Sequence, residues 1–243
     1  MSEDNKIEVL NGGFVRLVDS MGSDLSVVRS ARVSYLADWR EPEDGEVIGK
    51  DEKLIHYLMK NKHTSPFESC VFTFEVKAPI FVFRQWHRHR TWSFNEVSAR
   101  YTELDMGYYL PPLNKITGQS TSNKQKRTDE QHPEAPWIQK QMFYSISRSY
   151  KTYTRLIDSG CPRELARIVL PVAMYSKMFA TVDLHNLFHF LTLRLHTHAQ
   201  YEIRVYAEAM LELIKPIVPV CVAAFEEMRN PQPKPNIYPA LPC

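Results

Sequence analysis

Several familiar signatures are missing from this sequence. Its eight glycines form no G-x-G-x-x-G, which argues against a Rossmann-type flavin or nicotinamide dinucleotide site. No apolar run approaches the ~20 residues that a membrane-spanning helix needs, and no signal-peptide pattern opens the chain. The four cysteines form no C-x-x-C pair, which indicates reduced thiols rather than a disulfide framework or a structural zinc site. We therefore expect a cytoplasmic protein with no membrane partner. The cysteines are Cys70, Cys161, Cys221 and Cys243.

Lysine is also absent from residues 78–114, although arginine is abundant there. The run Arg88-His89-Arg90 places three cationic or potentially cationic groups together, and like charges repel unless an anion compensates them. Because arginine binds phosphate through a rigid fork of donors, this run predicts a nucleotide or dinucleotide ligand. The arginines of residues 84–100 are Arg84, Arg88, Arg90 and Arg100, and the only acid there is Glu96.

A basic segment is also typical of a solvated surface or of an arginine-rich nucleic-acid-binding module. Two features favour the nucleotide site. The apolar stretch Ile80–Phe83 and Trp86 set the basic run in sequence that looks packed, and nonspecific nucleic-acid surfaces usually mix lysine with arginine. We therefore expect no nucleic-acid partner. A nucleic-acid-binding module is kept as the alternative function.

The histidines raise a second alternative, a metal-dependent hydrolase. Three pairs have the H-x-H or H-x-x-x-H spacing of metal ligands. No glutamate follows His185 as in H-E-x-x-H, and no cysteine or carboxylate ligand accompanies the pairs. Neighbouring arginines would also oppose a divalent cation, so we expect no metal. The pairs are His87 and His89, His185 and His189, and His196 and His198.

The pattern of apolar residues predicts one α/β (α+β) domain over residues 1–230 and a proline-rich extended tail over 231–243. The segments 37–50 and 114–133 are expected to be surface loops, the second long and mobile. Strands are expected over residues 7–18 and 70–76. Helices are expected over 138–157 and 200–213, and three more helices are expected to begin at the caps Asp24, Asp51 and Asp183.

The segment Arg88–Tyr101 carries a longer pattern: R-H-R, two residues, Ser, four residues, Ser, one residue, Arg-Tyr. This pattern resembles the signature of flavin-dependent thymidylate synthases. Four further blocks resemble that family in the same order, so the resemblance covers the chain from about residue 7 to about residue 215. The blocks are LSVVRSARVS (25–34), HTSPFE (63–68), PRELARIVLP (162–171) and LTLRLHTHAQ (191–200).

The resemblance implies an enzyme that methylates dUMP to dTMP. Methylenetetrahydrofolate would supply the carbon, and FAD reduced by NADPH would supply the hydride. It also implies a domain with a central antiparallel or mixed sheet flanked by long helices. The chains would assemble as a homotetramer with active sites at the subunit interfaces.

The resemblance further assigns the site residues. Arg194 is the catalytic residue, because it would face the uracil ring and favour the base deprotonated at N3. The dUMP contacts are assigned to Gln85, Trp86, His87, Arg88, Glu96, Val97, Ser98, Ala99, Arg100, Arg167 and Arg194. The FAD contacts are assigned to Ser34, Ser65, Glu68, Arg88, His89, Arg90, Glu96, Asp183, His185 and His189.

Two of these residues and the thiols need separate interpretation. Asp183 departs from family members that carry an amide at this position, and a carboxylate there would alter the electrostatics of a flavin. Ser98 is interpreted as a phosphate contact rather than a nucleophile, because the sequence places no histidine with an orienting acid to activate it. No cysteine is expected to act as a nucleophile, and Cys70 and Cys221 are interpreted as small packing residues.

Overall fold

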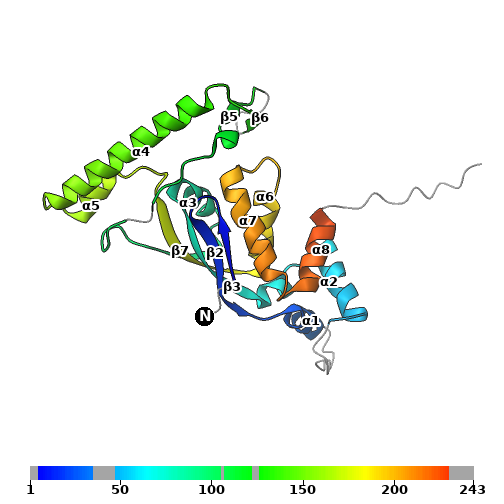
Figure 1. The fold of residues 1–243 in the computed structure, drawn as a ribbon. Helices are drawn as coiled ribbons and strands as arrows, with labels where there is room; N and C mark the ends of the chain where they lie inside the picture. The colour runs from blue at the N-terminus through cyan, green and yellow to red at the C-terminus, as the bar shows by residue number, and fades with distance from the viewer. Residues whose placement is uncertain (1–4, 35–46, 105–106, 122–125, 230–243) are drawn as a thin grey trace, which may run out of the picture.

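A computed structural model describes residues 5–34, 47–104, 107–121 and 126–229. Its centre is a five-stranded antiparallel sheet in the order β1-β2-β3-β7-β4 (Figure 1). This confirms the predicted combination of helices with a central sheet. The strands are β1 Lys6–Val9, β2 Gly13–Met21, β3 Val71–Pro79, β4 Ser93–Glu96 and β7 Tyr175–Asp183.

One face of the sheet carries the core. Alternate residues of β3 and β7 point to this face and are buried. Two helices, α6 (Leu184–Arg194) and α7 (Tyr201–Ile214), pack against it side by side. The Tyr206 hydroxyl of α7 donates to the Lys77 carbonyl of β3 at 2.9 Å, which holds helix and sheet together.

Three further helices gather at one end of the sheet: α1 (Asp24–Val33), α2 (Lys50–Lys60) and α8 (Pro219–Arg229) (Figure 1). The sequence did not predict α8. Asp24 was expected to cap α1, but Ser23 is that cap. The Asp24 carboxylate instead accepts from Val220 N at 2.8 Å and Cys221 N at 2.9 Å, at the start of α8.

Asp51 is the second aspartate that does not cap its own helix. Gly49 is the cap of α2, and Asp51 lies in the first turn, where it pairs with Arg32 of α1. By contrast, Asp183 caps α6 as predicted, and its carboxylate accepts from Asn186 N at 2.9 Å.

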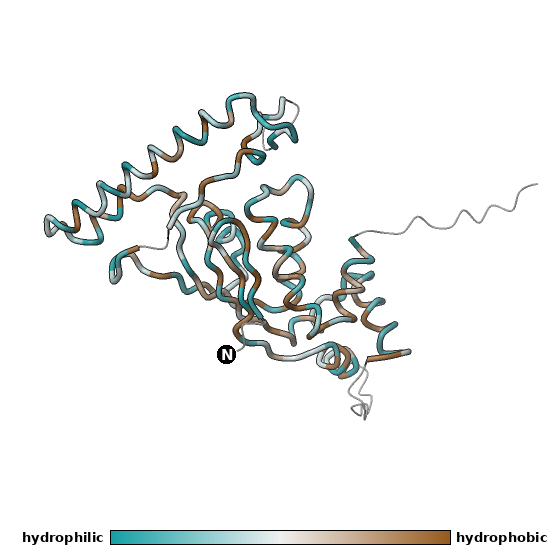
Figure 2. The backbone as a smooth tube through the Cα atoms, in the orientation of Figure 1, coloured by the Kyte–Doolittle hydropathy of each residue, from teal (hydrophilic) through white to brown (hydrophobic). Residues whose placement is uncertain are grey.

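The long helix α4 (Ala135–Asp158) confirms the predicted helix, and Gly160 follows it with a φ of 84° that glycine adopts without strain. Only Ala135, Ile146 and Tyr153 of its 24 residues are buried. Figure 1 shows it running along one side of the molecule, and the short helices α5 (Arg163–Ala166) and η4 (Arg167–Val169) follow it. Apolar positions recur along its length in Figure 2.

The expected loop at 114–133 is wrong for half of its length. It contains η3 (Leu113–Lys115) and a hairpin of β5 (Thr117–Gln119) and β6 (Arg127–Gln131). The hairpin is tied to the domain because Arg127 pairs with the buried Glu202 of α7. Sequence periodicity could not reveal this pairing.

Other predictions fall partly or wholly outside the described residues. The loop at 37–50 is described only from residue 47, and the tail at 231–243 is not described. Within the described ranges, no helix is long and apolar enough to cross a membrane. Two elements that the sequence analysis did not predict, α3 (Ile80–Trp86) and β7, carry much of the site.

Candidate active site

The basic segment alternates between the core and the surface. Trp86 is fully buried, Trp92 is 6% exposed and His89 is 7% exposed. The Trp86 ring stacks on Phe190 of α6, with centroids 4.9 Å apart, and meets Trp92 edge-on at 6.0 Å. The Trp86 side chain is therefore a core side chain, and a dUMP contact at this position stays a prediction.

The arginines of the segment point outward. Arg84, Arg88, Arg90 and Arg100 are all exposed. Arg100 lies 3.5 Å from Glu164, but both side chains are more than half exposed, so this ion pair is weak. Arg88 and Arg90 make no ion pair with any residue that the structure describes. Their guanidinium groups are available to an anion.

A cavity of about 700 Å³ lies beside α3 and the segment that follows β4. Val97 N donates to the Lys177 carbonyl of β7 at 2.9 Å, which fixes one wall. Six predicted site residues line this cavity: His87, Glu96, Val97, Ser98, Ala99 and Arg167. We call Ser98 and Arg167 the phosphate cluster, because they bring a hydroxyl and a guanidinium to a single cavity, which Glu96 also lines.

Ser98 shapes a turn at this cavity. Its Oγ accepts from Arg100 N at 3.3 Å, and its carbonyl accepts from Tyr101 N and Thr102 N. No histidine contacts its hydroxyl among the described residues, so the geometry agrees with a phosphate contact rather than a nucleophile.

Arg194 belongs to a different group of residues. Its Nε donates to His89 Nε2 at 3.1 Å, and its Nη2 donates to the Gln85 carbonyl at 3.2 Å. We call Gln85, His89 and Arg194 the base cluster. Both acceptors are neutral, and Arg194 has no carboxylate partner within the described ranges. The two hydrogen bonds hold the guanidinium in place, and no described counterion neutralises its charge.

His89 is not a third cation, which corrects the interpretation of the R-H-R run. Burial, and then the charges of Arg194 and His189, lower the pKa of His89 to about 4. The imidazole is therefore neutral near pH 7, and because Nε2 accepts from Arg194, the proton lies on Nδ1. The predicted repulsion is confined to Arg88 and Arg90, whose side chains point outward.

The base cluster does not line the cavity of the phosphate cluster. Gln85, Arg88 and Arg194 do not line the cavity that holds the phosphate cluster. Both clusters border α3. Its neighbouring residues Arg84 and Gln85 point to different places: Arg84 lines the cavity, whereas Gln85 belongs to the base cluster. This separation follows from helix geometry, because successive residues point about 100° apart.

Six of the ten residues assigned to FAD lie on three neighbouring elements, whereas Arg88, His89, Arg90 and Glu96 belong to the basic segment. Ser34 follows α1, Ser65 and Glu68 lie on η2 (Ser65–Ser69), and the other three lie on α6 or its cap. Leu184 N donates to the Cys70 carbonyl at 2.8 Å, so the starts of α6 and β3 are joined. The rings of His89 and His189 are 6.1 Å apart, which links this surface to the base cluster. The group on α6 and its cap is Asp183, His185 and His189.

Asp183 already has a structural role. Besides accepting from Asn186 N, its carboxylate accepts from Asn186 Nδ2 at 2.6 Å. A carboxylate at a helix N-terminus is stabilised by the helix dipole. The departure from an amide at this position therefore strengthens the start of α6.

The described residues offer little for a metal site or a thiol nucleophile. No group of three or more His, Cys, Asp or Glu side chains there is arranged to hold a metal ion. Cys70 and Cys221 are buried, as predicted for packing residues. Burial raises the pKa of the Cys70 thiol to about 11 and that of Cys221 well above its usual value, so both are protonated near pH 7.

Comparison with known proteins decides the family. The sequence profile described as thymidylate synthase complementing protein matches residues 16–220. The flavin-dependent thymidylate synthase of Treponema denticola is 48% identical over 227 residues, covering 92% of this chain and 82% of that protein. The chain belongs to this family. The enzyme of the same name from Thermotoga neapolitana is 44% identical over 220 residues, covering 90% and 94% of the two chains.

A solved structure resembles most of the chain. The UMP/dUMP methylase PolB from Streptomyces cacaoi, bound with 5-Br dUMP, superposes with a TM-score of 0.78 at 38% identity. The match covers 90% of this chain and 97% of the methylase. The family predicted from the Arg88–Tyr101 pattern is thus confirmed, and neither the hydrolase nor the nucleic-acid module gains support.

The structure also adds residues that the sequence did not single out. Arg84 and Ser176 line the cavity, and the Ser176 hydroxyl is buried without a hydrogen-bond partner in the described part of the chain. Gln200 reaches the base cluster, because its Oε1 accepts from Gln85 Nε2 at 2.7 Å. Gln200 ends the LTLRLHTHAQ block, so the resemblance offered a signal for it, whereas Ser176 lies in a strand that was not predicted.

Proposed function

We propose that this chain catalyses the reductive methylation of dUMP to dTMP. Methylenetetrahydrofolate is the carbon donor, and FAD reduced by NADPH is the hydride donor. The observation that carries the proposal is the Arg194 guanidinium, which two neutral acceptors orient and no described carboxylate neutralises. Membership of the flavin-dependent thymidylate synthase family supports the same reaction.

The phosphate cluster binds the nucleotide phosphate in this proposal. Ser98 provides a hydroxyl donor, and Arg167 and the nearby Arg100 provide charge-assisted donors. These contacts are the same in the ground state and in the transition state. They therefore contribute to affinity more than to the rate of the chemical step.

The base cluster acts on the pyrimidine. A positive charge beside N3 and its neighbouring carbonyl stabilises the base when it becomes anionic, and partial burial of Arg194 strengthens that interaction. His89 and the Gln85 carbonyl fix the direction of the guanidinium, so it does not have to reorient during the reaction.

The residues assigned to FAD suit such a ligand by their chemistry. Ser65 and Ser34 are exposed hydroxyl donors, and Arg88 and Arg90 are unpaired cations that would face a diphosphate. The chemistry that FAD supplies when bound is hydride transfer. The neutral His89 would border the same ligand, since its ring lies 6.1 Å from that of His189.

We further propose a homotetramer whose active sites form between subunits. Two observations support it. The base cluster does not line the cavity of the phosphate cluster, and α4 leaves large apolar side chains in solvent. Trp137 and Tyr144 are more than half exposed, which is unusual for a helix of a lone monomer.

The proposed reaction is tested by adding dUMP, methylenetetrahydrofolate and NADPH to purified protein under anaerobic conditions. We expect a yellow protein with a flavin spectrum that oxidises NADPH and forms dTMP. Chromatography measures the dTMP that is formed. A colourless protein that binds no FAD and forms no dTMP would sink the proposal.

A second substrate deserves a direct comparison, because the similar solved structure is a UMP/dUMP methylase. The same assay with UMP measures formation of 5-methyl-UMP. Since the relatives compared are thymidylate synthases, we expect kcat/KM for dUMP to exceed that for UMP. A higher value for UMP would make the chain a UMP methylase instead.

A further inference from the structure

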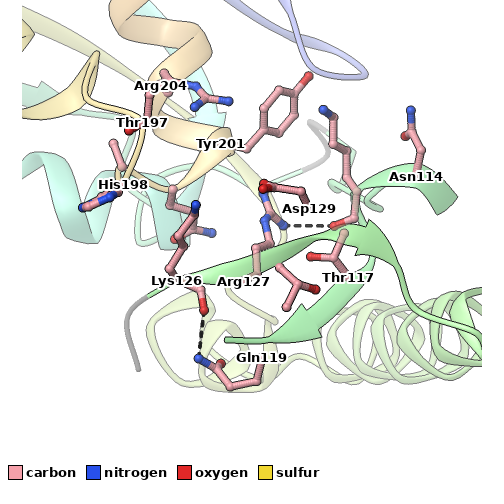
Figure 3. A pocket seen from close by; sticks show the side chains of 14 residues that line it. Asn114, Thr117, Gln119, Lys126, Arg127, Asp129, Thr197, His198, Tyr201 and Arg204 are labelled. Atoms are coloured by element: carbon pink, nitrogen blue, oxygen red, sulfur yellow. Dashed lines mark hydrogen bonds between the residues drawn. The ribbon is translucent and has the colours of Figure 1, made fainter. Parts of the chain in front are cut away.

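A second cavity lies between the β5–β6 hairpin and the start of α7 (Figure 3). It has a volume of about 270 Å³, and none of the residues assigned to dUMP or FAD lines it. Figure 3 shows Lys126 and Arg127 on the hairpin side, with His198, Tyr201 and Arg204 on the other wall. We call this cavity the basic pocket.

The pocket carries an excess of positive charge. Its lining includes Lys115, Lys126, Arg127 and Arg204 but only one carboxylate, Asp129. Lys126 makes no ion pair with a residue that the structure describes. The pairing of Arg204 with Glu208 is long, at 3.6 Å, and Glu208 is largely exposed.

These cations gather around one aromatic ring. The Lys115 ammonium lies 4.2 Å from the centre of the Tyr201 ring, and the guanidinium carbons of Arg127 and Arg204 lie 6.0 and 5.9 Å from it. A ring attracts cations through its quadrupole but carries no net charge. The positive field of the pocket therefore persists.

A buried carboxylate keeps the pocket in shape. Glu202, 2% exposed, accepts from Arg127 Nη2 through both oxygens at 3.1 Å. It also accepts from the Tyr109 hydroxyl at 3.1 Å and from Gln200 Nε2 at 2.9 Å. With four hydrogen bonds it holds the hairpin against α7, so the cations are in place before a ligand arrives.

The start of α7 adds to the field. Gln200 is its N-cap, yet its side chain makes no capping hydrogen bond, because the amide is engaged by Gln85 and Glu202. The positive end of this 14-residue helix thus lies at the pocket wall. Gln200 also joins the pocket to the base cluster, since its Oε1 accepts from Gln85 Nε2.

We propose that the basic pocket binds the oxyanion end of an extended co-substrate whose reactive ring lies at the base cluster. The inference rests on the proposed function. Two co-substrates of that reaction carry such an end: NADPH has a 2′-phosphate, and methylenetetrahydrofolate has glutamate carboxylates. Both present oxygen anions at a distance from the reacting atoms, and Gln200 connects the pocket to the base cluster.

The test uses FAD-loaded protein saturated with dUMP, so that the other anion sites are filled. Calorimetry measures binding of 2′,5′-ADP, with 5′-AMP as its reference, and of tri-γ-glutamate. We expect one of the two anionic probes to bind, and Lys126→Ala and Arg204→Ala each to weaken it about tenfold or more. Lys126→Arg keeps the charge and should retain binding.

Lys215→Ala is the matched control, because it removes an exposed charge just beyond the other end of α7. It should bind both probes as the wild type does. The source of the oxyanion follows from kinetics with the same variants. A raised KM for NADPH but not NADH identifies the 2′-phosphate, and a raised KM for polyglutamylated but not monoglutamylated folate identifies the glutamate tail.

The two proposals fail separately. Wild-type protein that binds a probe through Lys126 and Arg204 but forms no dTMP overturns the proposed reaction alone. Protein that forms dTMP but binds neither probe overturns the inference about the basic pocket. Variants that bind a probe as tightly as the wild type overturn it as well.

Discussion

Arg100 and Arg194 differ in what surrounds their guanidinium groups. Arg100 is exposed beside Ser98 and pairs only weakly with Glu164. Arg194 is half-buried, its direction fixed by His89 and the Gln85 carbonyl. The first surrounding suits a contact that adds affinity, and the second suits a charge positioned for one step of a reaction.

Alanine substitutions should separate these roles. Arg100→Ala should weaken dUMP binding about ten- to a hundredfold and leave the chemical step nearly unchanged at saturation. Arg194→Ala should slow the chemical step more than it weakens binding. Dissociation constants for dUMP and single-turnover flavin oxidation rates measure both effects, with Arg229→Ala on α8 as control. An Arg194→Ala variant with a normal rate at saturating dUMP would make Arg194 a binding residue only.

His89 predicts a pH dependence of stability. Its pKa of about 4 lies below its ordinary value of 6.5, so the unfolded chain binds a proton that the folded chain refuses. The free energy of unfolding should therefore fall as pH drops from about 6.5 towards 4. His89→Gln keeps an acceptor for Arg194 but cannot titrate. Urea unfolding at pH 7 and pH 5 should show that this variant loses less free energy of unfolding between the two pH values than the wild type does. An equal loss in both proteins would assign the pH dependence to other groups.

At the scale of elements, α8 shows how a distant residue can start a helix. Its first N–H groups are satisfied by Asp24, 196 residues away in sequence and only 5% exposed. Asp24→Ala should destabilise the fold by about 2–3 kcal/mol, because one buried and one part-buried donor lose their acceptor. Asp24→Asn, which keeps one acceptor oxygen, should cost less.

Asp19→Ala is the matched control, since Asp19 is exposed and, among the described residues, accepts only from the neighbouring Ser20 N. Its effect on urea unfolding should stay within about 0.5 kcal/mol. If Asp24→Ala were as mild as this control, α8 would not depend on the cap.

The same scale shows which elements can be predicted from sequence. The α4 helix was predictable because its apolar residues recur over 24 positions, and Asp183 was predictable as a cap because it lies next to its helix. The α3 helix has only seven residues, too few to show a period. The core face of β7 includes Ser176 and Ala180, which weakly signal a strand, and α8 has its cap far away in sequence.

The candidate site was predictable to a similar degree. The linear pattern identified the family, but it could not tell that Trp86 and His89 point inward while Arg88 points outward. It also could not tell that the phosphate and base clusters border α3 separately. These properties depend on packing against α6, which no local pattern records.

At the scale of the whole molecule, the separated clusters and the exposed α4 point in one direction. If each active site combines the phosphate cluster of one chain with the base cluster of another, two variants that are each impaired at low dUMP concentration can complement each other. Arg167→Ala removes a residue of the first cluster, and Arg194→Ala removes one of the second. Each protein alone lacks an intact site.

Unfolding and refolding the two variants together at equal amounts should restore activity. By random pairing, about a quarter of the sites would combine two intact clusters, so about a quarter of wild-type activity is expected at dUMP concentrations below KM. Light scattering on the same samples should give the mass of four chains. The control is an Arg167→Ala/Arg194→Ala double variant refolded with either single variant, which leaves every site incomplete. No recovery in the mixture of single variants, with tetramers present, would mean that both clusters of a site come from the same chain and that the assembly serves another purpose.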